Sequence, residues 1–206
     1  MGLWERHVVS RVIACGCCLP PVMERRAKVV PLAQGSVLEV GCGAGANFRF
    51  YDDGRVSSVD AIDPSPELLQ RARDAAPDNA IDFRLGPGVG EALPFADESF
   101  DSVVLTFTLC SVGNPSDVLR EARRVLKPTG KLLFLEHGLS PDRGLQRWQR
   151  RVDHVWPALM GNCHLSRAIT PPIRANGFEI IRSDSGYVDK TPRFLGWMEW
   201  GEAIVA

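Results

Sequence analysis

Strand-like and helix-like stretches of apolar residues alternate along most of the chain. Apolar, β-rich runs predict strands at residues 36–40, 57–63, 81–85, 102–107 and 131–135, and a last pair at 178–183 and 200–205. Helical spacing predicts helices at 67–75 and 117–126. The run at 102–107 is apolar at almost every position, as in a strand that is buried on both faces. This alternation predicts an α/β fold with a mostly parallel sheet and helices on both faces.

Two further segments complete a single domain of 206 residues, a length that suits one hydrophobic core. Residues 1–34 predict an N-terminal helical cap that is broken at Pro20-Pro21. Residues 140–170 form a long segment after the fifth strand, and we expect a lid there. Large apolar residues recur in this segment at roughly helical spacing, at Trp148, Val152, Val155, Trp156 and Leu159. They predict an amphipathic helix that packs on the sheet or lines a substrate pocket.

Composition and charge narrow the classes of function. The formal net charge of −1 argues against a nucleic-acid partner, because such binding usually needs a basic surface. No run of 18 apolar residues predicts a membrane span, which leaves peripheral membrane contact and the oligomeric state open. The six cysteines show no metal-ligand spacing with histidines, so we expect a reducing cytoplasm and no metal. Residues 15–18 (Cys-Gly-Cys-Cys) predict small buried side chains, with acylation or metal binding as alternatives.

A glycine loop follows the first predicted strand and indicates a nucleotide-like ligand. Gly41, Gly43 and Gly45 allow close approach of backbone amides to that ligand. The pattern also fits a nicotinamide dinucleotide or a purely structural turn. Glu39, two residues before the loop, favours S-adenosylmethionine because a carboxylate there is placed to face the cationic end of that molecule. Asp63 ends the second strand and is predicted to accept the ribose hydroxyls, with Asp60 as the competing candidate.

Further segments of the sequence resemble known enzymes. Residues 90–95 (Gly-Glu-Ala-Leu-Pro-Phe), 98–101 and 121–130 resemble the corresponding segments of quinone-biosynthesis-type methyltransferases. Residues 41–51, 109–112, 136–137 and 162–167 are similar to the methyltransferase-like branch that includes animal alkyl-thiol methyltransferases. The resemblance implies the Rossmann-like class I methyltransferase fold, with seven strands and an antiparallel last strand. It implies S-adenosylmethionine as the methyl donor and suggests a small acceptor, with a thiol favoured.

The resemblance and the position of each residue at a strand end together give an expected donor site. It comprises Glu39, Gly41, Cys42, Gly43, Gly45, Asn47, Asp63, Pro64, Val89, Gly90, Glu91, Thr106 and Leu109. Quinone-type relatives usually carry an aspartate where this chain has Val89, so contacts to the adenine are expected from the backbone around Val89 and Gly90. The animal members of the branch carry an N-terminal membrane anchor, whereas residues 1–30 here are too polar to span a membrane.

The expected acceptor side follows the fourth and fifth strands. Glu136 and His137 are the candidate catalytic residues, although such a pair is often a structural contact. Other candidates lie after the fourth strand, in the lid and in the N-terminal segment: Phe107, Cys110, Asp153, His154, Cys163 and His164, with Trp4, His7 and Arg11 closing over the site. Methyl transfer needs no enzyme nucleophile, which argues against that role for Cys163. A non-catalytic donor-binding protein and a nicotinamide-dependent oxidoreductase are the alternative functions.

Overall fold

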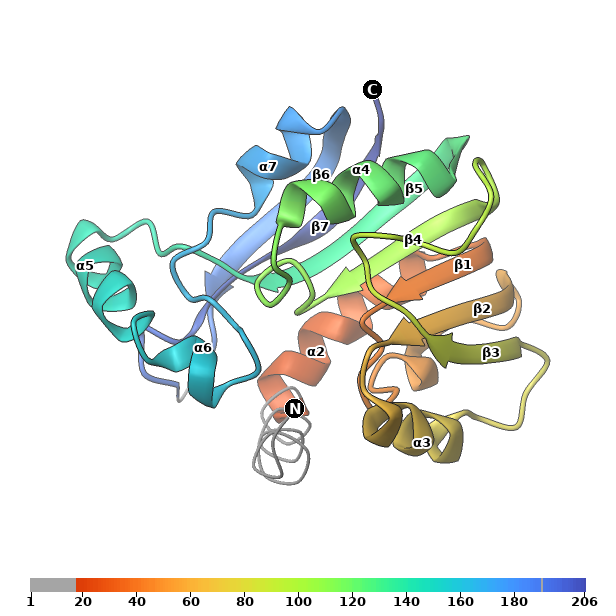
Figure 1. The fold of residues 1–206 in the computed structure, drawn as a ribbon, viewed down its shortest axis with the longest axis horizontal. Coiled ribbons are helices and arrows are strands. Elements are labelled where there is room, and N and C mark those ends of the chain that lie inside the picture. The colour runs from red at the N-terminus through yellow and green to blue at the C-terminus, as the bar shows by residue number, and fades with distance from the viewer. Residues whose placement is uncertain (1–17, 190) are drawn as a thin grey trace.

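A seven-stranded sheet forms the centre of the protein, as a computed structural model that describes residues 18–206 except position 190 shows (Figure 1). The strands are β1 (Gly35–Val40), β2 (Val56–Asp63), β3 (Asp82–Pro87), β4 (Phe100–Thr106), β5 (Leu126–His137), β6 (Phe178–Tyr187) and β7 (Trp197–Val205). Their spatial order is β3-β2-β1-β4-β5-β7-β6. β1 to β5 pair in parallel, whereas β7 is antiparallel to both β5 and β6. The predicted mostly parallel sheet with an antiparallel last strand is confirmed.

The helices begin where the sequence supplies prolines and capping side chains. They are α2 (Pro20–Val29), α3 (Pro66–Ala75), α4 (Pro115–Val125), α5 (Arg143–Val152), α6 (Trp156–Leu159) and α7 (Thr170–Ala175), with short 3-10 turns η2 (Val30–Leu32) and η3 (Phe48–Phe50). Ser65 and Asn114 cap α3 and α4 with their side-chain oxygens. Pro20-Pro21 marks the first turn of α2, where proline is well tolerated. The remainder of the predicted N-terminal cap, residues 1–17, lies outside the described residues.

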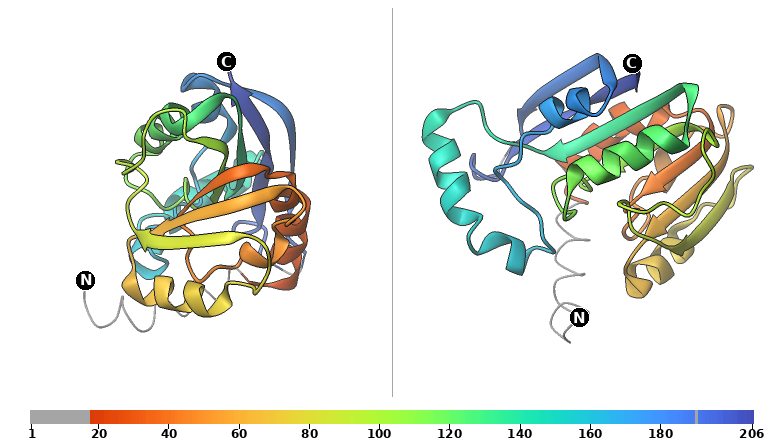
Figure 2. Two further views of the ribbon diagram at one scale, coloured as in Figure 1. Left: turned by 90° about the vertical axis from the view of Figure 1, so that its right-hand side faces the viewer. Right: turned by 45° about the horizontal axis from the view of Figure 1, so that its top comes forward.

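Successive residues of the central strands pack against opposite faces of the sheet. Leu133 belongs to a core cluster that includes Leu69 of α3 and residues of α2. Its neighbour Leu132 belongs to a second cluster, which includes Leu119 of α4 and Ile173 of α7. The tilted view in Figure 2 shows α4 and α7 in front of the sheet and α2 behind it. The predicted covering of both faces by helices is confirmed, and it explains why these strands are apolar throughout.

The carboxyl ends of β1, β2, β4 and β5 meet at one edge of the sheet. Beyond this edge lie α5, α6 and the start of α2 (Figure 1). Segments far apart in the sequence therefore meet around the strand ends, which is where open α/β sheets bind their ligands. In the part of the chain that the structure describes, no helix is both long and apolar enough to cross a membrane.

Candidate active site

A cavity of about 610 Å³ opens at the carboxyl edge of the sheet, and its walls are mostly apolar. The walls come from the connections after β1 to β4, the end of β5, α2, α6 and the β6–β7 connection. Many of the predicted site residues line it, namely Gly41, Cys42, Gly43, Asp63, Pro64, Val89, Gly90, Glu91, Thr106 and His137. Other predicted residues lie behind the wall, namely Glu39, Gly45, Asn47, Leu109 and Glu136.

The glycine loop after β1 forms one wall of the cavity. Gly41 has a φ of +75°, and a Cβ atom there would lie 2.8 Å from Oγ1 of Thr108, so the position requires glycine. Gly43 has a φ of +55°, and a Cβ atom there would meet nothing within 4 Å. Gly43 thus exposes backbone to open space within the wall. This is the arrangement that lets a ligand approach backbone amides directly.

Asp63 stands at the end of β2 and is oriented by two backbone amides. Gly43 and Ser65 each donate a hydrogen bond of 2.9 Å from their amide nitrogen to this carboxylate. Burial raises the pKa of Asp63 above its ordinary value, against the lowering effect of these two bonds. Asp60 lies elsewhere on the strand, pairs with Arg84 at 3.5 Å and is absent from the cavity wall. Of the two candidate aspartates, Asp63 therefore lies at the cavity and Asp60 does not.

Glu39 does not face the cavity as the sequence led us to expect. Its side chain is buried, and its two oxygens accept hydrogen bonds from Asn47 Nδ2 at 3.0 Å and the Tyr51 hydroxyl at 2.7 Å. Burial raises its pKa to about 7, although Tyr51, Arg26 and Asn47 each lower it. The carboxylate thus holds Asn47 and Tyr51, which follow the glycine loop, and lies behind the cavity wall.

Arg26 of α2 is a cavity residue that sequence reasoning missed. Its Nη1 donates hydrogen bonds to Oδ1 of Asn47 at 2.6 Å and to Oγ1 of Thr106 at 2.9 Å. Its guanidinium also lies 5.1 Å from the centre of the Phe107 ring. Only 4% of Arg26 is exposed, yet it lines the cavity. A fixed positive charge therefore stands beside the glycine loop, where an anionic group of a ligand could bind.

Glu136 holds the connection after β4 in place. Its carboxylate is completely buried and accepts backbone hydrogen bonds from Thr108, Leu109 and Cys110 at 2.9 to 3.1 Å. Burial raises its pKa to about 7 against the lowering effect of these bonds. Glu136 does not line the cavity, so its geometry favours a role in positioning the loop. A catalytic role for Glu136 stays a prediction that this geometry does not support.

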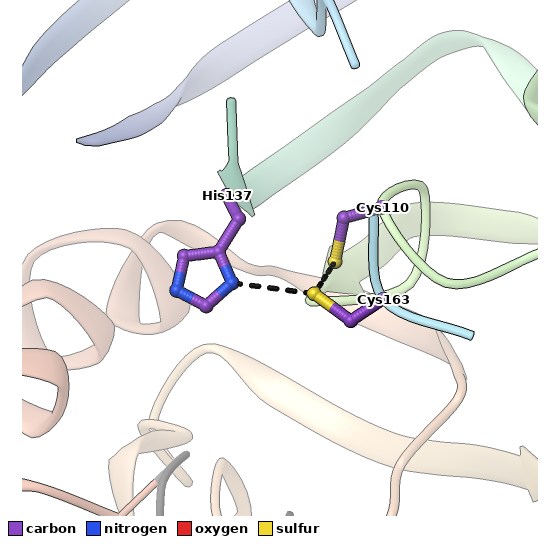
Figure 3. A group of neighbouring side chains, drawn as sticks. All are labelled: Cys110, His137 and Cys163. Carbon is purple, nitrogen blue, oxygen red and sulfur yellow. Dashed lines mark hydrogen bonds between the residues drawn. The ribbon is translucent and has the colours of Figure 1, made fainter. Parts of the chain in front are cut away.

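His137 faces the cavity together with two cysteines (Figure 3). Its Nδ1 lies 3.5 Å from Sγ of Cys163, and that sulfur lies 3.7 Å from Sγ of Cys110. Phe107, which has a φ of +57°, packs edge-on against the His137 ring with centroids 5.0 Å apart. The hydrogen bond with Cys110 and then His137 lower the pKa of Cys163 below its usual value. The expectation of no metal rested on chain spacing alone, and the fold brings these three residues together.

The predicted lid consists of two helices, and only part of its apolar face reaches the cavity. Trp156 lines the cavity together with Met160 and Gly161. In contrast, Trp148, Val155 and Leu159 are between 52% and 60% exposed, so the prediction that they line a pocket or pack on the sheet was wrong. The predicted single helix is in fact two, because α5 ends at Val152 and α6 begins after a turn at Trp156-Pro157.

Of the polar residues that we expected in the lid to point into the pocket, only Cys163 lines the cavity. Asp153 accepts hydrogen bonds from the amides of Leu165 and Ser166 at 2.8 and 2.9 Å, so it fixes the return of the chain to the sheet. His154 and His164 are not in the cavity wall, whereas Cys163 is. Of the remaining sequence expectations, Trp4, His7, Arg11, Cys15 and Cys17 lie outside the described residues, and Cys18 is exposed at the mouth of the cavity.

The β6–β7 connection also contributes to the wall, which no sequence pattern indicated. Val188 and Leu195 of this connection line the cavity, together with Met198 at the start of β7. In the spatial order of the sheet, β7 and β6 lie on the other side of β4 and β5 from β1, which carries the glycine loop at its end. The cavity thus has one end at the glycine loop and Asp63, and an apolar end at the lid and the β6–β7 connection.

Comparisons with known proteins agree with this architecture. Residues 38–134 match the family model described as Methyltransferase domain. Thiol S-methyltransferase TMT1B of Rattus norvegicus is 41% identical over 175 residues, which cover 82% of this chain and 68% of the rat protein. Ubiquinone/menaquinone biosynthesis C-methyltransferase UbiE of Dinoroseobacter shibae is 38% identical over 122 residues, covering 58% of this chain and 49% of that protein.

Solved structures extend the likeness to the whole sheet. A chain from the complex of the Haloferax volcanii Trm112 methyltransferase activator with a methyltransferase superposes with a TM-score of 0.72. The match covers 98% of this chain and 96% of that chain at 18% sequence identity. At this identity the comparison shows the fold, and the chemistry must be argued from the site.

Proposed function

Because the chain belongs to the family of S-adenosylmethionine-dependent methyltransferases, we propose that its acceptor is a small apolar thiol, methylated by in-line displacement. The chain is an enzyme of this family and its donor is S-adenosylmethionine. The single observation that carries the acceptor proposal is the apolar end of the cavity, where the His137 ring packs against Phe107 near the lid.

The donor end of the cavity supports a defined orientation of the methyl donor. Asp63 is the acceptor for the ribose hydroxyls, and the backbone around Val89 and Gly90 flanks the adenine. Gly43 lets the middle part of the donor approach the backbone closely, since no side chain fills the space in front of this glycine. Arg26 supplies the positive charge for the donor's carboxylate. A donor held by these residues would carry its methyl group to the part of the cavity that Phe107 and His137 line.

The acceptor end favours an apolar nucleophile with a low pKa. Transfer from a sulfonium neutralises charge, so the protein must mainly align the acceptor, exclude water and accommodate a lost proton. A thiol, with an ordinary pKa of about 8.5, needs less help than an alcohol or amine. Val188, Leu195 and Met198 would bury an alkyl chain, whereas a charged acceptor would lose its hydration on entry. In this proposal His137, which lines the cavity, takes the thiol proton.

The relatives support the same acceptor class. The rat protein that covers most of this chain is named a thiol S-methyltransferase, and the bacterial protein that covers less of it is named a C-methyltransferase. A quinol or phenol is therefore the acceptor to test against the thiol.

A screen of purified protein tests this proposal through release of S-adenosylhomocysteine. Alkyl thiols, phenols, quinols, amines and carboxylates of matched chain length are compared under one set of conditions. We expect kcat/KM for alkyl thiols to exceed that for amines by at least about tenfold. Good turnover of a phenol or quinol with none of any thiol would overturn the acceptor while leaving the donor site intact.

A matched pair of tryptophan variants locates the acceptor within the cavity. Trp156 lines the cavity, whereas Trp148 of the same lid is 58% exposed and lies outside it. Trp156→Ala is expected to raise KM for long alkyl thiols by at least about tenfold, because the lost contact is a large apolar surface. Trp148→Ala is expected to leave KM unchanged. An equal change of KM in both variants would show that the acceptor does not bind against Trp156.

A further inference from the structure

Three separate elements deliver soft metal ligands to one point in the cavity wall. Cys110 follows β4, His137 ends β5 and Cys163 follows α6 (Figure 3). One ligand atom from each of them lies within 4.8 Å of the other two. All three side chains line the cavity beside the expected position of the donor's methyl group. Two thiols and an imidazole are ligands that zinc prefers in proteins.

The distances within this cluster match those around a tetrahedral zinc ion. Zn–S bonds of about 2.3 Å and Zn–N bonds of about 2.0 to 2.1 Å place two sulfurs about 3.8 Å apart, and a sulfur and a nitrogen about 3.5 Å apart. The Cys110 and Cys163 sulfurs are 3.7 Å apart, and Cys163 Sγ lies 3.5 Å from His137 Nδ1. The remaining edge, between Cys110 and His137, needs to shorten by about 1.3 Å at most, which a side-chain rotation supplies.

The cluster is held in place by contacts around it. Glu136 fixes the backbone of Cys110 by accepting its amide hydrogen bond at 3.1 Å. The segment that carries Cys163 is joined to the same loop, because His164 donates its amide proton to the Cys110 carbonyl at 2.7 Å. Asn162 adds a bond of 2.7 Å from Nδ2 to the Ser111 carbonyl. Such supporting bonds orient metal ligands before the metal binds.

We propose that Cys110, His137 and Cys163 bind a zinc ion and leave its fourth position open to the cavity, where the acceptor thiol coordinates as a thiolate. Three protein ligands with one open position are the arrangement of catalytic zinc, whereas structural zinc has four protein ligands. The acceptor part of this proposal rests on the proposed thiol methyltransferase function. The zinc-binding part of the proposal is independent of that function.

The zinc ion changes how the thiol is activated. The acceptor thiol forms a sulfur–zinc bond and releases its proton to solvent, and His137 serves as a ligand rather than as the base. The bound sulfur then attacks the donor's methyl carbon, and the electron pair of the breaking carbon–sulfur bond remains on the donor sulfur. The products are a thioether, which leaves the zinc, and S-adenosylhomocysteine. Zinc therefore supplies the thiolate at neutral pH without a titratable base.

Zinc binding to the full chain tests the site without relying on turnover. Reduced protein, stripped with a chelator, is titrated with zinc in competition with a chromophoric chelator. We expect one zinc ion per chain, and Cys163→Ser to weaken binding by at least about a hundredfold. Cys42→Ser is the matched control, because Cys42 lines the same cavity but its sulfur, which donates to the Gly43 carbonyl at 3.8 Å, is not part of the cluster. Cobalt bound to the wild type should show thiolate-to-cobalt charge-transfer absorption that Cys163→Ser diminishes.

Absence of stoichiometric zinc binding, or equal binding by wild type and Cys163→Ser, would overturn the site. Thermal unfolding of each variant without metal shows whether a loss of binding reflects a loss of fold. Cys110→Ser is a second ligand variant, and it should weaken zinc binding as Cys163→Ser does.

Turnover of an alkyl thiol separates this inference from the proposed function. Removal of zinc is expected to lower thiol methylation at least about tenfold, restored by added zinc, with unchanged affinity for S-adenosylhomocysteine. Equal thiol turnover with and without zinc would overturn the acceptor role of the metal and favour His137 as the base. Zinc binding with no thiol turnover in either form, but turnover of another acceptor, would overturn the thiol acceptor and leave the metal site standing.

Discussion

Arg26 of α2 donates a hydrogen bond of 2.9 Å to Oγ1 of Thr106 at the end of β4, a residue 80 positions further along the chain. The same nitrogen donates to Asn47 Oδ1 at 2.6 Å, behind the glycine loop. One buried guanidinium therefore joins α2 to the end of β4 and to the loop after β1, which both border the proposed donor site. A positive charge in this position costs desolvation, so its neighbours must compensate for it. Glu39 is one of them, because the charge of Arg26 lowers its pKa against the raising effect of burial.

Arg26→Gln is expected to weaken S-adenosylhomocysteine binding at least about tenfold, because the donor's carboxylate loses a charge-assisted hydrogen bond. Binding of methylthioadenosine, which has no carboxylate, should change much less. Calorimetry with both ligands measures the difference. Arg25→Gln is the matched control, since Arg25 bonds the Pro21 and Tyr187 carbonyls outside the cavity wall. An equal loss for both ligands would indicate that Arg26 supports the fold of the site only.

Asp63→Ala is expected to weaken donor binding by about tenfold or more, whereas Asp60→Ala should leave it nearly unchanged. The Asp63 carboxylate lines the cavity and also accepts the Gly43 amide at 2.9 Å, so its loss removes the ribose acceptor and loosens the loop. Asp60 contacts Arg84 on the sheet instead. Matched titrations with S-adenosylhomocysteine measure both variants. Equal losses would show that the ribose does not bind at the end of β2.

Gly43→Ala is expected to lower donor affinity strongly and the stability of the fold only slightly. The new methyl group would stand in the open space in front of the loop, where nothing of the protein lies within 4 Å, and would exclude the donor. The positive φ of +55° adds a destabilisation of about 1 kcal/mol. Donor affinity should fall at least about tenfold with a small decrease in the urea midpoint. Gly86→Ala, also in open space but outside the cavity wall, should not affect donor affinity.

The fold could be predicted because the strands of a parallel sheet are covered on both faces. Such strands require nearly continuous apolar runs, and the run at 102–107 coincides closely with β4. The lid shows the limit of the same reasoning. Helical spacing indicates an amphipathic helix but not the surface that its apolar side meets, and Trp148 and Val155 face solvent.

The candidate site was predictable at the strand ends and not beyond them. Asp63 directly precedes a proline, so local sequence marks the end of β2. Arg26 gives no such signal, because an arginine in a short amphipathic helix normally faces water. Cys110 and Cys163 are 53 positions apart and meet only through the path of the lid across the sheet edge. Contacts of this kind are a property of the topology rather than of any motif.

Glu39 predicts a decline in stability with rising pH. Burial raises its pKa in the folded protein from 4.5 to about 7, so the folded state binds more protons than the unfolded state between these values. The stabilising contribution is complete below about pH 4.5 and is lost as the pH rises through about 7, by up to roughly 1.4 kcal/mol per pH unit. The urea midpoint of the protein without donor should therefore fall from pH 5 to pH 7.5.

Two variants identify Glu39 as the source of this decline. The glutamine in Glu39→Gln stays neutral, so the variant should show a flatter dependence of the urea midpoint on pH. Burial also raises the pKa of Glu136 to about 7, and this residue contributes the same residual slope to the wild type and the variant. Tyr51→Phe removes the 2.7 Å hydrogen bond that lowers the pKa of Glu39, so the decline should extend to higher pH. Denaturation in urea at half-unit pH steps measures all three proteins. A Glu39→Gln profile as steep as that of the wild type would show that Glu39 is ionised throughout this range, with Asn47, Tyr51 and Arg26 outweighing its burial.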